Sequence, residues 1–293
     1  MTGQYGRRRF LAGASLTGAG LLAGCLNDSN SGEPEASETA TTTEELPDVV
    51  TEIGFEGMDL VVGLRPDAAV SKLNLISPDG TAFASKSVTR GATTVRIPIL
   101  ELRQLSSRYR HYSPGIHELV VITEDSVKRT QLSLEPDVQL VDIEVNSVAR
   151  DGLRQGKLLF RMENQGTAPT WIFDITYEGA PNFGANDPLS DFPGLPKLQS
   201  PSEAPDLVLG PNEQVELVPE SNPLRFSSRE YSGCDLGIFE IRALIGVATG
   251  EMIQVDLAGQ IDGDEINQDL LGEYACSESS VEISAIKRSR WEN

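Results

Sequence analysis

Residues 158–177 read LLFRMENQGTAPTWIFDITY, two apolar-rich runs separated by a polar stretch. In the first run every second residue from Leu158 to Met162 is large and apolar, and the same holds from Trp171 to Tyr177. A period of two is the pattern of a β-strand that buries one face. The stretch between the runs contains Gly166 and Pro169, which favour a turn. The segment therefore predicts two strands joined by a turn.

The same pattern continues on both sides of this segment. From Val49 onward short β-like runs alternate with Gly- and Pro-rich turns, and no stretch has a convincing helical period. Ser77-Pro78-Asp79-Gly80 predicts a type I turn, and the polar segment 101–112 leaves room for one helical turn. The sequence predicts an all-β fold. The strand-like runs are 59–64, 70–76, 93–100, 116–122, 126–134, 138–145, 239–247, 253–257 and 280–286.

A domain boundary is expected at Glu135-Pro136-Asp137, because a fresh series of strands begins after it. The tract 112–121 resembles the "Pro-Gly-x-Tyr-x-Leu-x-Val" strand of extracellular immunoglobulin-like modules, with His117 where those modules usually carry Tyr. The run from Glu163 to Pro169, "Glu-Asn-x-Gly-Thr-x-Pro" between two strands, resembles the start of adhesion-type immunoglobulin-like domains. These resemblances imply two immunoglobulin-like β-sandwich domains, residues 48–136 and 137–293, and imply no activity.

The N-terminus has the pattern of an export signal, residues 1–24. Basic residues Arg7 to Arg9 precede an uncharged run from Ala12 to Gly24, which is too short for a transmembrane helix. Arg7 and Arg8 followed by Phe10 and Leu11 resemble the twin-arginine signal, which a receptor reads to export folded proteins.

The signal ends in Leu22-Ala23-Gly24-Cys25, which resembles the lipobox of exported lipoproteins. That resemblance implies cleavage before Cys25 and attachment of lipid to its sulfur; the alternative is a coincidental cysteine after an ordinary signal. Two chains on Cys25 would anchor the protein stably. No later segment offers 18 uninterrupted apolar residues, because the best, residues 236–248, contains Glu240 and Arg242. We expect the mature protein on the outer face of the cytoplasmic membrane, held through Cys25.

Residues 25–47 are predicted to be the lipidated cysteine and a disordered tether. The segment is rich in Ser, Thr and Glu and almost lacks large apolar residues, so it cannot bury enough surface to fold. Its threonines and the sequon Asn27-Asp28-Ser29 are candidates for glycosylation, and a plain spacer is the alternative.

Charge narrows the choice of partners. The 293 residues include 44 Asp and Glu against 24 Lys and Arg, a net charge of −20, which excludes nucleic-acid binding through a basic surface. Only six of the basic residues are Lys. This acidic, lysine-poor composition resembles proteins of salt-loving archaea, and it implies a halophilic protein. Loss of the signal removes Arg7, Arg8 and Arg9 and leaves 21 basic residues, a net charge of −23.

The segment 179–223 is predicted to be a long Pro-rich loop of the second domain. Nine of the chain's 17 prolines lie between Glu178 and Pro223. Because long loops in compact domains are usually functional or disordered, we expect a binding surface here. The alternative is a Pro-stiffened insertion that packs on its own sandwich.

Once Cys25 is assigned to lipid, Cys234 and Cys276 remain. In an exported protein they are expected to form a disulfide, which would close a loop of about 40 residues and stabilise the fold by roughly 3–4 kcal/mol. The alternative is two buried thiols.

Neither histidines nor acidic residues form a recognisable metal site. We expect His111 on the surface and His117 on a strand face, and the pair lacks a third ligand at a metal-binding spacing. The acidic run 262–269 has the look of a calcium loop, but Ile266 and Asn267 stand where an oxygen ligand and Gly are needed. It is interpreted as a solvated turn, with a weak cation site as the alternative.

The sequence contains no catalytic motif for nucleophile, phosphate or dinucleotide chemistry. We therefore expect no catalytic residues, no cofactor and no metal. The leading hypothesis is a non-enzymatic lipoprotein that binds or scaffolds an envelope protein or polysaccharide. The alternatives are a ligand-capturing lipoprotein that serves a transporter and a hydrolase that uses carboxylates.

Overall fold

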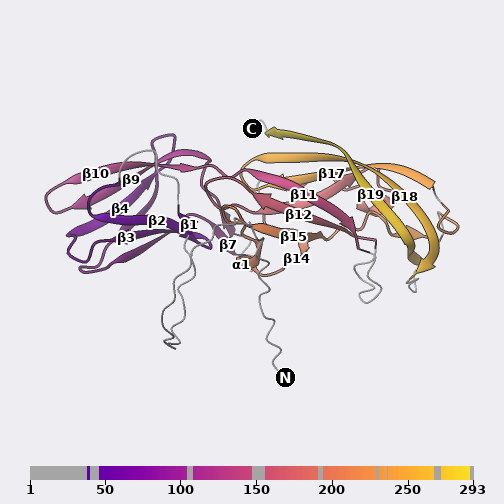
Figure 1. Ribbon diagram of the computed structural model, residues 1–293, viewed down its shortest axis with the longest axis horizontal. Coiled ribbons are helices and arrows are strands. Elements are labelled where there is room, and N and C mark those ends of the chain that lie inside the picture. Colours follow the sequence, from indigo (N-terminus) through magenta and orange to yellow (C-terminus); the bar gives the residue numbers. More distant parts are fainter. Residues whose placement is uncertain are drawn as a thin grey trace, which may run out of the picture. The chain divides into compact units, whose positions relative to one another are not determined.

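Strands dominate the structure, a computed structural model (Figure 1). It describes residues 38–39, 46–103, 108–146, 156–190, 194–228, 231–235, 237–266 and 272–290. Within these ranges the helical elements are one 3₁₀ turn, η2 (Phe183–Ala185), and one α-helical turn, α1 (Ala204–Leu207). The prediction of an all-β fold is confirmed.

Residues 38–134 form two antiparallel four-stranded sheets, with the orders β1-β2-β3-β6 and β10-β9-β4-β5. Leu60 and Val62 of one sheet and Leu73 and Leu75 of the other are fully buried in the hydrophobic core. The strands are β1 (Glu38–Thr39), β2 (Val50–Glu56), β3 (Asp59–Leu64), β4 (Val70–Ile76), β5 (Ala82–Ser87), β6 (Thr94–Pro98), β9 (Gly115–Thr123) and β10 (Val127–Leu134).

The turn predicted at residues 77–80 connects β4 and β5. The Gly80 amide donates to the Ser77 carbonyl at 2.9 Å, and Gly80 adopts a φ of 83°, which favours glycine. Asp79 Oδ1 accepts hydrogen bonds from the amide and hydroxyl of Thr81 at 2.9 and 2.8 Å. The turn residues therefore fix the reversal through local hydrogen bonds.

Residues 138–290 form two further antiparallel sheets, one with the order β11-β12-β15-β14 and one with the order β13-β17-β18-β19-β16. We call the second the five-stranded sheet. The strands are β11 (Val138–Val145), β12 (Leu158–Asn164), β13 (Ile172–Glu178), β14 (Leu198–Ser200), β15 (Gln214–Pro219), β16 (Phe226–Ser227), β17 (Gly237–Val247), β18 (Glu251–Ile266) and β19 (Glu273–Arg290).

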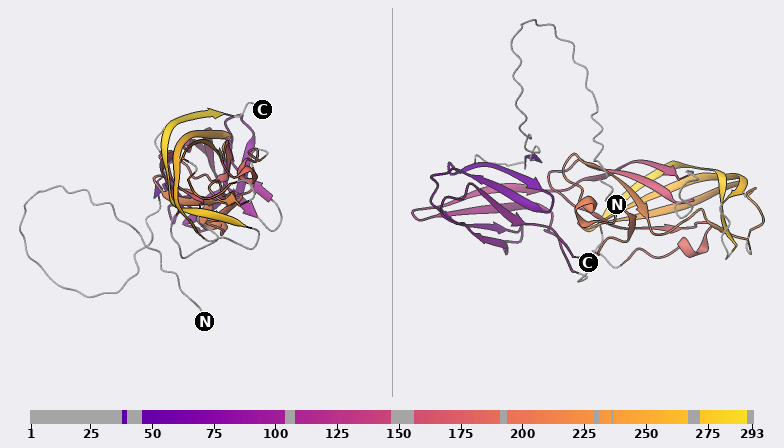
Figure 2. Two further views of the ribbon diagram at one scale, coloured as in Figure 1. Left: turned by 90° about the vertical axis from the view of Figure 1, so that its right-hand side faces the viewer. Right: turned by 90° about the horizontal axis from the view of Figure 1, so that it is seen from below.

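No sheet of the described residues takes strands from both halves of the chain. In Figure 2 the strands coloured indigo to magenta group among themselves, as do those coloured pink to yellow. Residues 37–293 nevertheless form one compact unit by their contacts. The boundary expected near Pro136 agrees with the sheet memberships, and a division into two domains remains a prediction.

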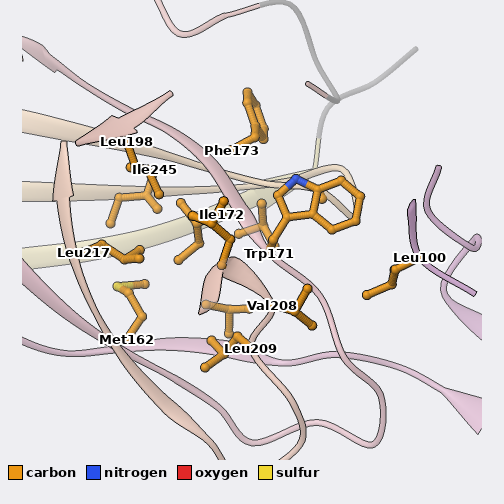
Figure 3. Close-up of a cluster of buried hydrophobic side chains, with 14 of the residues drawn as sticks. Leu100, Met162, Trp171, Ile172, Phe173, Leu198, Val208, Leu209, Leu217 and Ile245 are labelled. Carbon is orange, nitrogen blue, oxygen red and sulfur yellow. The ribbon is translucent and has the colours of Figure 1, made fainter. Parts of the chain in front are cut away.

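Apolar side chains fill the space between the two sheets of the second half. Figure 3 shows Met162 and Leu217 in the same cluster as Trp171 and Ile245, and all four are buried. Burial of one such side chain contributes about 1.5–3 kcal/mol. Phe173 packs against the backbone of β17, because a Cβ at position 246 would lie 2.3 Å from its ring, so glycine is required there.

Two predictions for irregular segments were wrong. The described parts of 101–112 contain a hairpin of β7 (Glu101–Arg103) and β8 (Arg108–Arg110), with no helical turn. The segment 179–223 contains β14, α1 and β15, and β15 pairs with β12 in the middle of its sheet. Prolines 211 and 219 lie before β15 and at its last residue, where they leave its ladder with β12 intact.

Candidate functional site

The connection between β13 and β14 covers part of the outer face of the five-stranded sheet. Asp174 and Thr176 point to this face, yet both are buried. The Ser190 amide donates to Asp174 Oδ2 at 3.2 Å, and the Ser190 hydroxyl also donates to Asp174. Trp171 Nε1 donates to the Gly194 carbonyl at 3.2 Å. The described part of the connection is thus fastened to β13 by buried polar groups.

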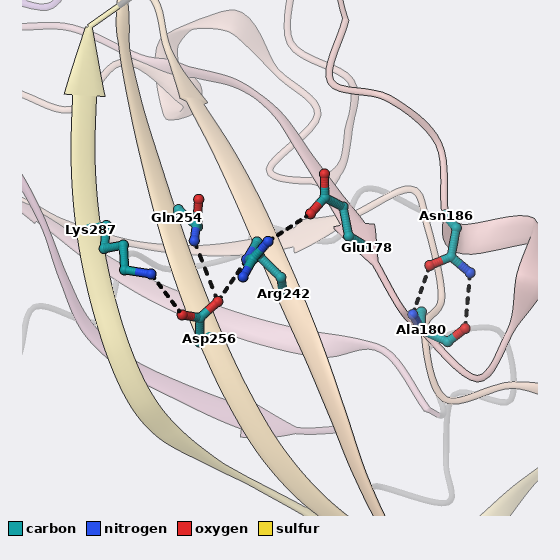
Figure 4. Close-up of polar contacts among 7 residues, drawn as sticks. All are labelled: Glu178, Ala180, Asn186, Arg242, Gln254, Asp256 and Lys287. Carbon is teal, nitrogen blue, oxygen red and sulfur yellow. Dashed lines mark hydrogen bonds and ion pairs between the residues drawn. The ribbon is translucent and has the colours of Figure 1, made fainter.

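The first part of this connection is a turn built from hydrogen bonds, residues 180–186, which we call the presenting turn. The Asn186 side chain bonds both backbone groups of Ala180, accepting from its amide at 2.7 Å and donating to its carbonyl at 2.9 Å (Figure 4). Asn182 caps η2 by accepting from the Gly184 amide at 3.1 Å, and its Nδ2 donates to the Asn222 carbonyl at 2.7 Å. Asparagine is favoured in such turns because its side chain replaces backbone partners.

Phe183 stands on the presenting turn with its ring in solvent. Phe183 is 82% exposed and Ile238 is 83% exposed, and the next most exposed large apolar residue of the described chain is Val127 at 56%. Ile238 is the second residue of β17, and β13 runs antiparallel to β17 and ends just before the presenting turn. The two exposed side chains therefore lie at the same end of the five-stranded sheet.

A shallow hollow of about 480 Å³ lies on the outer face beside the presenting turn and is lined by residues that include Gly179 and Glu240. A ladder of ion pairs crosses it from β13 to β19 (Figure 4). Arg242 bonds Asp256 at 2.7 Å and Glu178 at 3.1 Å, and the Lys287 ammonium lies 3.5 Å from Asp256. The hydrogen bond from Arg242 lowers the pKa of Asp256 below its usual value.

A larger cleft of about 770 Å³ lies near the predicted boundary, where residues 135–137 meet the end of β19. Arg288 on its wall donates to Asp137 at 2.7 Å and also pairs with Glu251. Glu135 and Arg290 also line the cleft, together with Pro114 and Pro136, so its lining is part polar and part apolar. The charged residues could orient a polar small molecule.

Asp174, Ser190 and Lys197 are the described trio that most resembles catalytic machinery, because Lys197 Nζ also donates to the Ser190 hydroxyl. A serine activated by lysine needs that lysine buried and neutral. Lys197 is exposed, and the Ser190 proton is directed to Asp174. We therefore assign these three residues a structural role, which is to hold the β13–β14 connection against β13.

The surface position expected for His111 was wrong. Its Nε2 lies 3.0 Å from Thr170 Oγ1, and its ring packs 5.0 Å from that of Trp171. Burial lowers the pKa of His111 to about 4. His117 lies on β9, as expected for a strand-face residue, and is fully buried. Burial lowers its pKa as well.

The structure joins Cys234 and Cys276 in a disulfide with an S–S distance of 2.05 Å, so that pairing is confirmed. The described part of the acidic run 262–269 lies at the end of β18. Among the described residues no three His, Cys, Asp or Glu side chains are grouped to hold a metal ion.

The export and anchoring residues Arg7, Arg8, Phe10, Leu11 and Cys25 lie outside the described residues, as does most of the tether. In the part of the chain that the structure describes, no helix has the length and hydrophobicity needed to cross a membrane.

Comparison of the chain with protein-family models, curated proteins and solved structures gave no match.

The exposed Phe183 is the feature that the sequence did not reveal. Reasoning from prolines placed a binding surface within 179–223, which includes the presenting turn. The usable signal was the pair Asn182 and Asn186 around a Phe-Gly, since asparagines at this spacing favour a hydrogen-bonded turn.

Proposed function

We propose that the protein is an exported, lipid-anchored, non-enzymatic module that binds or scaffolds another component of the cell envelope through the end of the five-stranded sheet. The observation that carries this proposal is the exposure of Phe183 on a turn whose backbone is already hydrogen-bonded. A membrane anchor at Cys25, followed by the tether, would allow this end of the sheet to contact partners at a distance from the membrane surface.

An exposed phenylalanine on an ordered turn is an effective anchor for a protein partner. Aromatic side chains that fill a pocket supply much of the binding energy of protein interfaces. Ordering a loop on binding costs affinity, and a turn that is ordered beforehand avoids that cost. In the presenting turn Asn182 and Asn186 supply the order, so the ring of Phe183 is free to supply the contact.

The strand order supports the immunoglobulin-like resemblance. In the second half β14-β15-β12-β11 forms one sheet and β13-β17-β18 the core of the other, which is the D-E-B-A and C-F-G order of an immunoglobulin constant-type sandwich. Strand β19 is added beyond β18. Such sandwiches commonly serve binding on cell surfaces, which favours a binding role over an enzymatic one.

Replacing Phe183 by serine should remove the main contact with the partner. We expect the Phe183→Ser chain, captured from cross-linked membranes, to lose one or more partners that the unchanged chain retains. A typical anchor contributes about 2 kcal/mol or more to binding, which corresponds to roughly 30-fold in affinity.

The matched control is Val127→Ser, which removes another exposed apolar side chain from the strand β10. It should leave the set of partners unchanged. Equal sets for all three chains would contradict the proposal. Deletion of 179–211 is a poorer test, because it removes the buried Leu198 and Leu207 from the core.

Export should depend on the paired arginines. Replacing Arg7 and Arg8 by lysine should leave full-length precursor in the cytoplasm, because a receptor reads the arginine pair rather than its charge. Fractionation followed by immunoblotting measures this, with a lysine substitution of Arg9 as the matched control. Normal delivery of the double variant to the membrane would exclude the twin-arginine route.

Capture of a small ligand for a transporter is the second candidate function, and the 770 Å³ cleft with charged residues in its lining is the observation that favours it. The described structure contains only two helical turns. The usual solute receptors have two hinged α/β lobes, so this chain would have to capture its ligand in a different way.

A further inference from the structure

Carboxylates surround the two exposed apolar side chains at the end of the five-stranded sheet. Five of them are exposed and form what we call the acidic rim: Asp187, Asp235, Glu240, Asp262 and Glu278. None belongs to an ion pair within the described chain. The rim therefore gives this end an uncompensated negative charge.

Strand register places three members of the rim on the strands beside Ile238. Glu240 lies two residues after Ile238 on β17, so both side chains point to the outer face. Gly179, just before the presenting turn, lies against Glu240, since a Cβ at 179 would be 3.4 Å from its carbonyl oxygen. Ile238 pairs with Gln260, and Asp262 follows two residues later opposite Glu278.

Among the residues that the structure describes, the basic side chains discussed next are paired with carboxylates outside the rim. Arg242 is held between Glu178 and Asp256, and Arg225 pairs with Glu273 at 2.9 Å. Two carboxylates directly opposite each other, as at Asp262 and Glu278, destabilise a sheet. Cations that approach the rim reduce the electrostatic repulsion among its carboxylates.

We propose that the partner is a protein that offers an apolar pocket bordered by Lys and Arg side chains. This inference rests on the proposed function and adds the chemistry of the partner. Phe183 enters the pocket, Ile238 extends the apolar contact, and the rim carboxylates pair with the border cations. Charges at the edge of an interface select the partner and speed association, while the buried aromatic residue holds the complex. An anionic membrane surface would repel the rim, and a zwitterionic one has no net positive charge to attract it.

Two synthetic amphipathic helical peptides serve as probes. They share one apolar face of Leu and Phe, and their polar faces carry either Lys and Arg or Glu. Their affinities for the full chain are measured at about 0.1 M ionic strength, where charges act over about 10 Å. The basic peptide should bind, and the acidic peptide should bind at least tenfold more weakly. Equal binding of the two peptides would overturn the proposal.

Substitutions measure the contributions of Phe183 and of the acidic rim to binding separately. Phe183→Ser should weaken binding of the basic peptide about 30-fold. The pair Asp187→Lys and Glu240→Lys should weaken it about tenfold. The control pair Glu124→Lys and Asp125→Lys changes the net charge equally at the distant β9–β10 turn and should weaken it less than threefold.

The outcomes distinguish this inference from the proposed function. Suppose that the rim pair and the control pair weaken binding equally while Phe183→Ser still weakens it about 30-fold. The inference about the charge of the partner would then be wrong, and the proposed binding role would stand. If Phe183→Ser has no effect on either the peptide or the membrane partners, both fail. Binding of the full chain to zwitterionic vesicles that depends on Phe183 would replace the protein partner with a lipid surface.

Discussion

A chain in which Cys234 and Cys276 are both replaced by alanine should unfold with a free energy about 4 kcal/mol lower than that of the unchanged chain. The two cysteines are 42 residues apart, and a cross-link that closes such a loop removes conformational freedom from the unfolded chain. The effect is large because it acts through the unfolded state as well as through the two buried positions. For a chain of this size it corresponds to a fall in melting temperature of about 10 °C.

The position of the disulfide explains which part of the fold should loosen first. Cys276 lies on β19 opposite Glu265 of β18, and Cys234 lies in the segment that leads from β16 to β17. Tyr274 on the same strand donates to the Gly233 carbonyl at 2.9 Å. The disulfide therefore fixes the end of the sheet that carries Ile238, and its loss should raise amide exchange there before the rest of the sheet.

Thermal unfolding with and without reductant provides the control. The unchanged chain under reductant should match the double variant, and Cys25→Ala, which removes only the expected lipid site, should retain the full stability of the unchanged chain. A double variant whose unfolding free energy falls by less than 1 kcal/mol would show that the bond contributes little to the fold.

The strands of the fold follow from the sequence because their period is a local property. The runs 59–64, 70–76 and 138–145 became β3, β4 and β11 with the same bounds. Alternation of apolar residues selects the strand and its buried face without knowledge of the partner strand. Strand β15 was not predicted because Pro211 precedes it and Pro219 is its last residue, although Val215 and Leu217 alternate with polar Glu216 within it.

Features that depend on distant partners could not be predicted. Asp174 and Thr176 alternate with apolar residues, a pattern that predicts exposed side chains. Both are nevertheless buried, and Ser190 of the β13–β14 connection donates a hydrogen bond to Asp174. Only the path of that connection decides their burial, and the strand pattern carries no information about it. The same limit applies to His111, whose contact with Thr170 spans 59 positions of the sequence. The binding surface that we propose was predicted only as a segment, because exposure of the Phe183 ring is set by the surrounding fold.

His111 should make the protein sensitive to acid, with a loss of about 3 kcal/mol of stability between pH 6.5 and 4. Its partly buried ring has a pKa of about 4 in the folded state against about 6.5 for an unfolded chain. Between these values the unfolded state binds more protons, so stability falls as the pH falls. The contribution is complete above pH 6.5 and is lost below pH 4.

The surroundings of the ring explain why protonation is costly. Nδ1 lies 2.6 Å from the carbonyl oxygen of Tyr112 and so donates to it, which leaves Nε2 to accept from the Thr170 hydroxyl at 3.0 Å. A second proton on Nε2 would require the Thr170 hydroxyl to rotate and would place a charge against the rings of Tyr112 and Trp171. No nearby carboxylate contributes to the shift.

Urea unfolding of the unchanged chain and of His111→Asn, at a series of pH values from 7 to 4, measures this contribution. Asparagine keeps a side-chain donor for the Tyr112 carbonyl and does not titrate, so the variant should lose about 3 kcal/mol less than the unchanged chain over this range. Burial also lowers the pKa of His117, which both chains retain, so its contribution cancels in the comparison. If the unfolding free energies of the two chains fall in parallel as the pH is lowered, His111 is not the acid-sensitive group. A steeper curve for the unchanged chain, together with early loss of the Trp171 fluorescence signal, would place the first step of acid unfolding at the contact between residues 111–112 and 169–171.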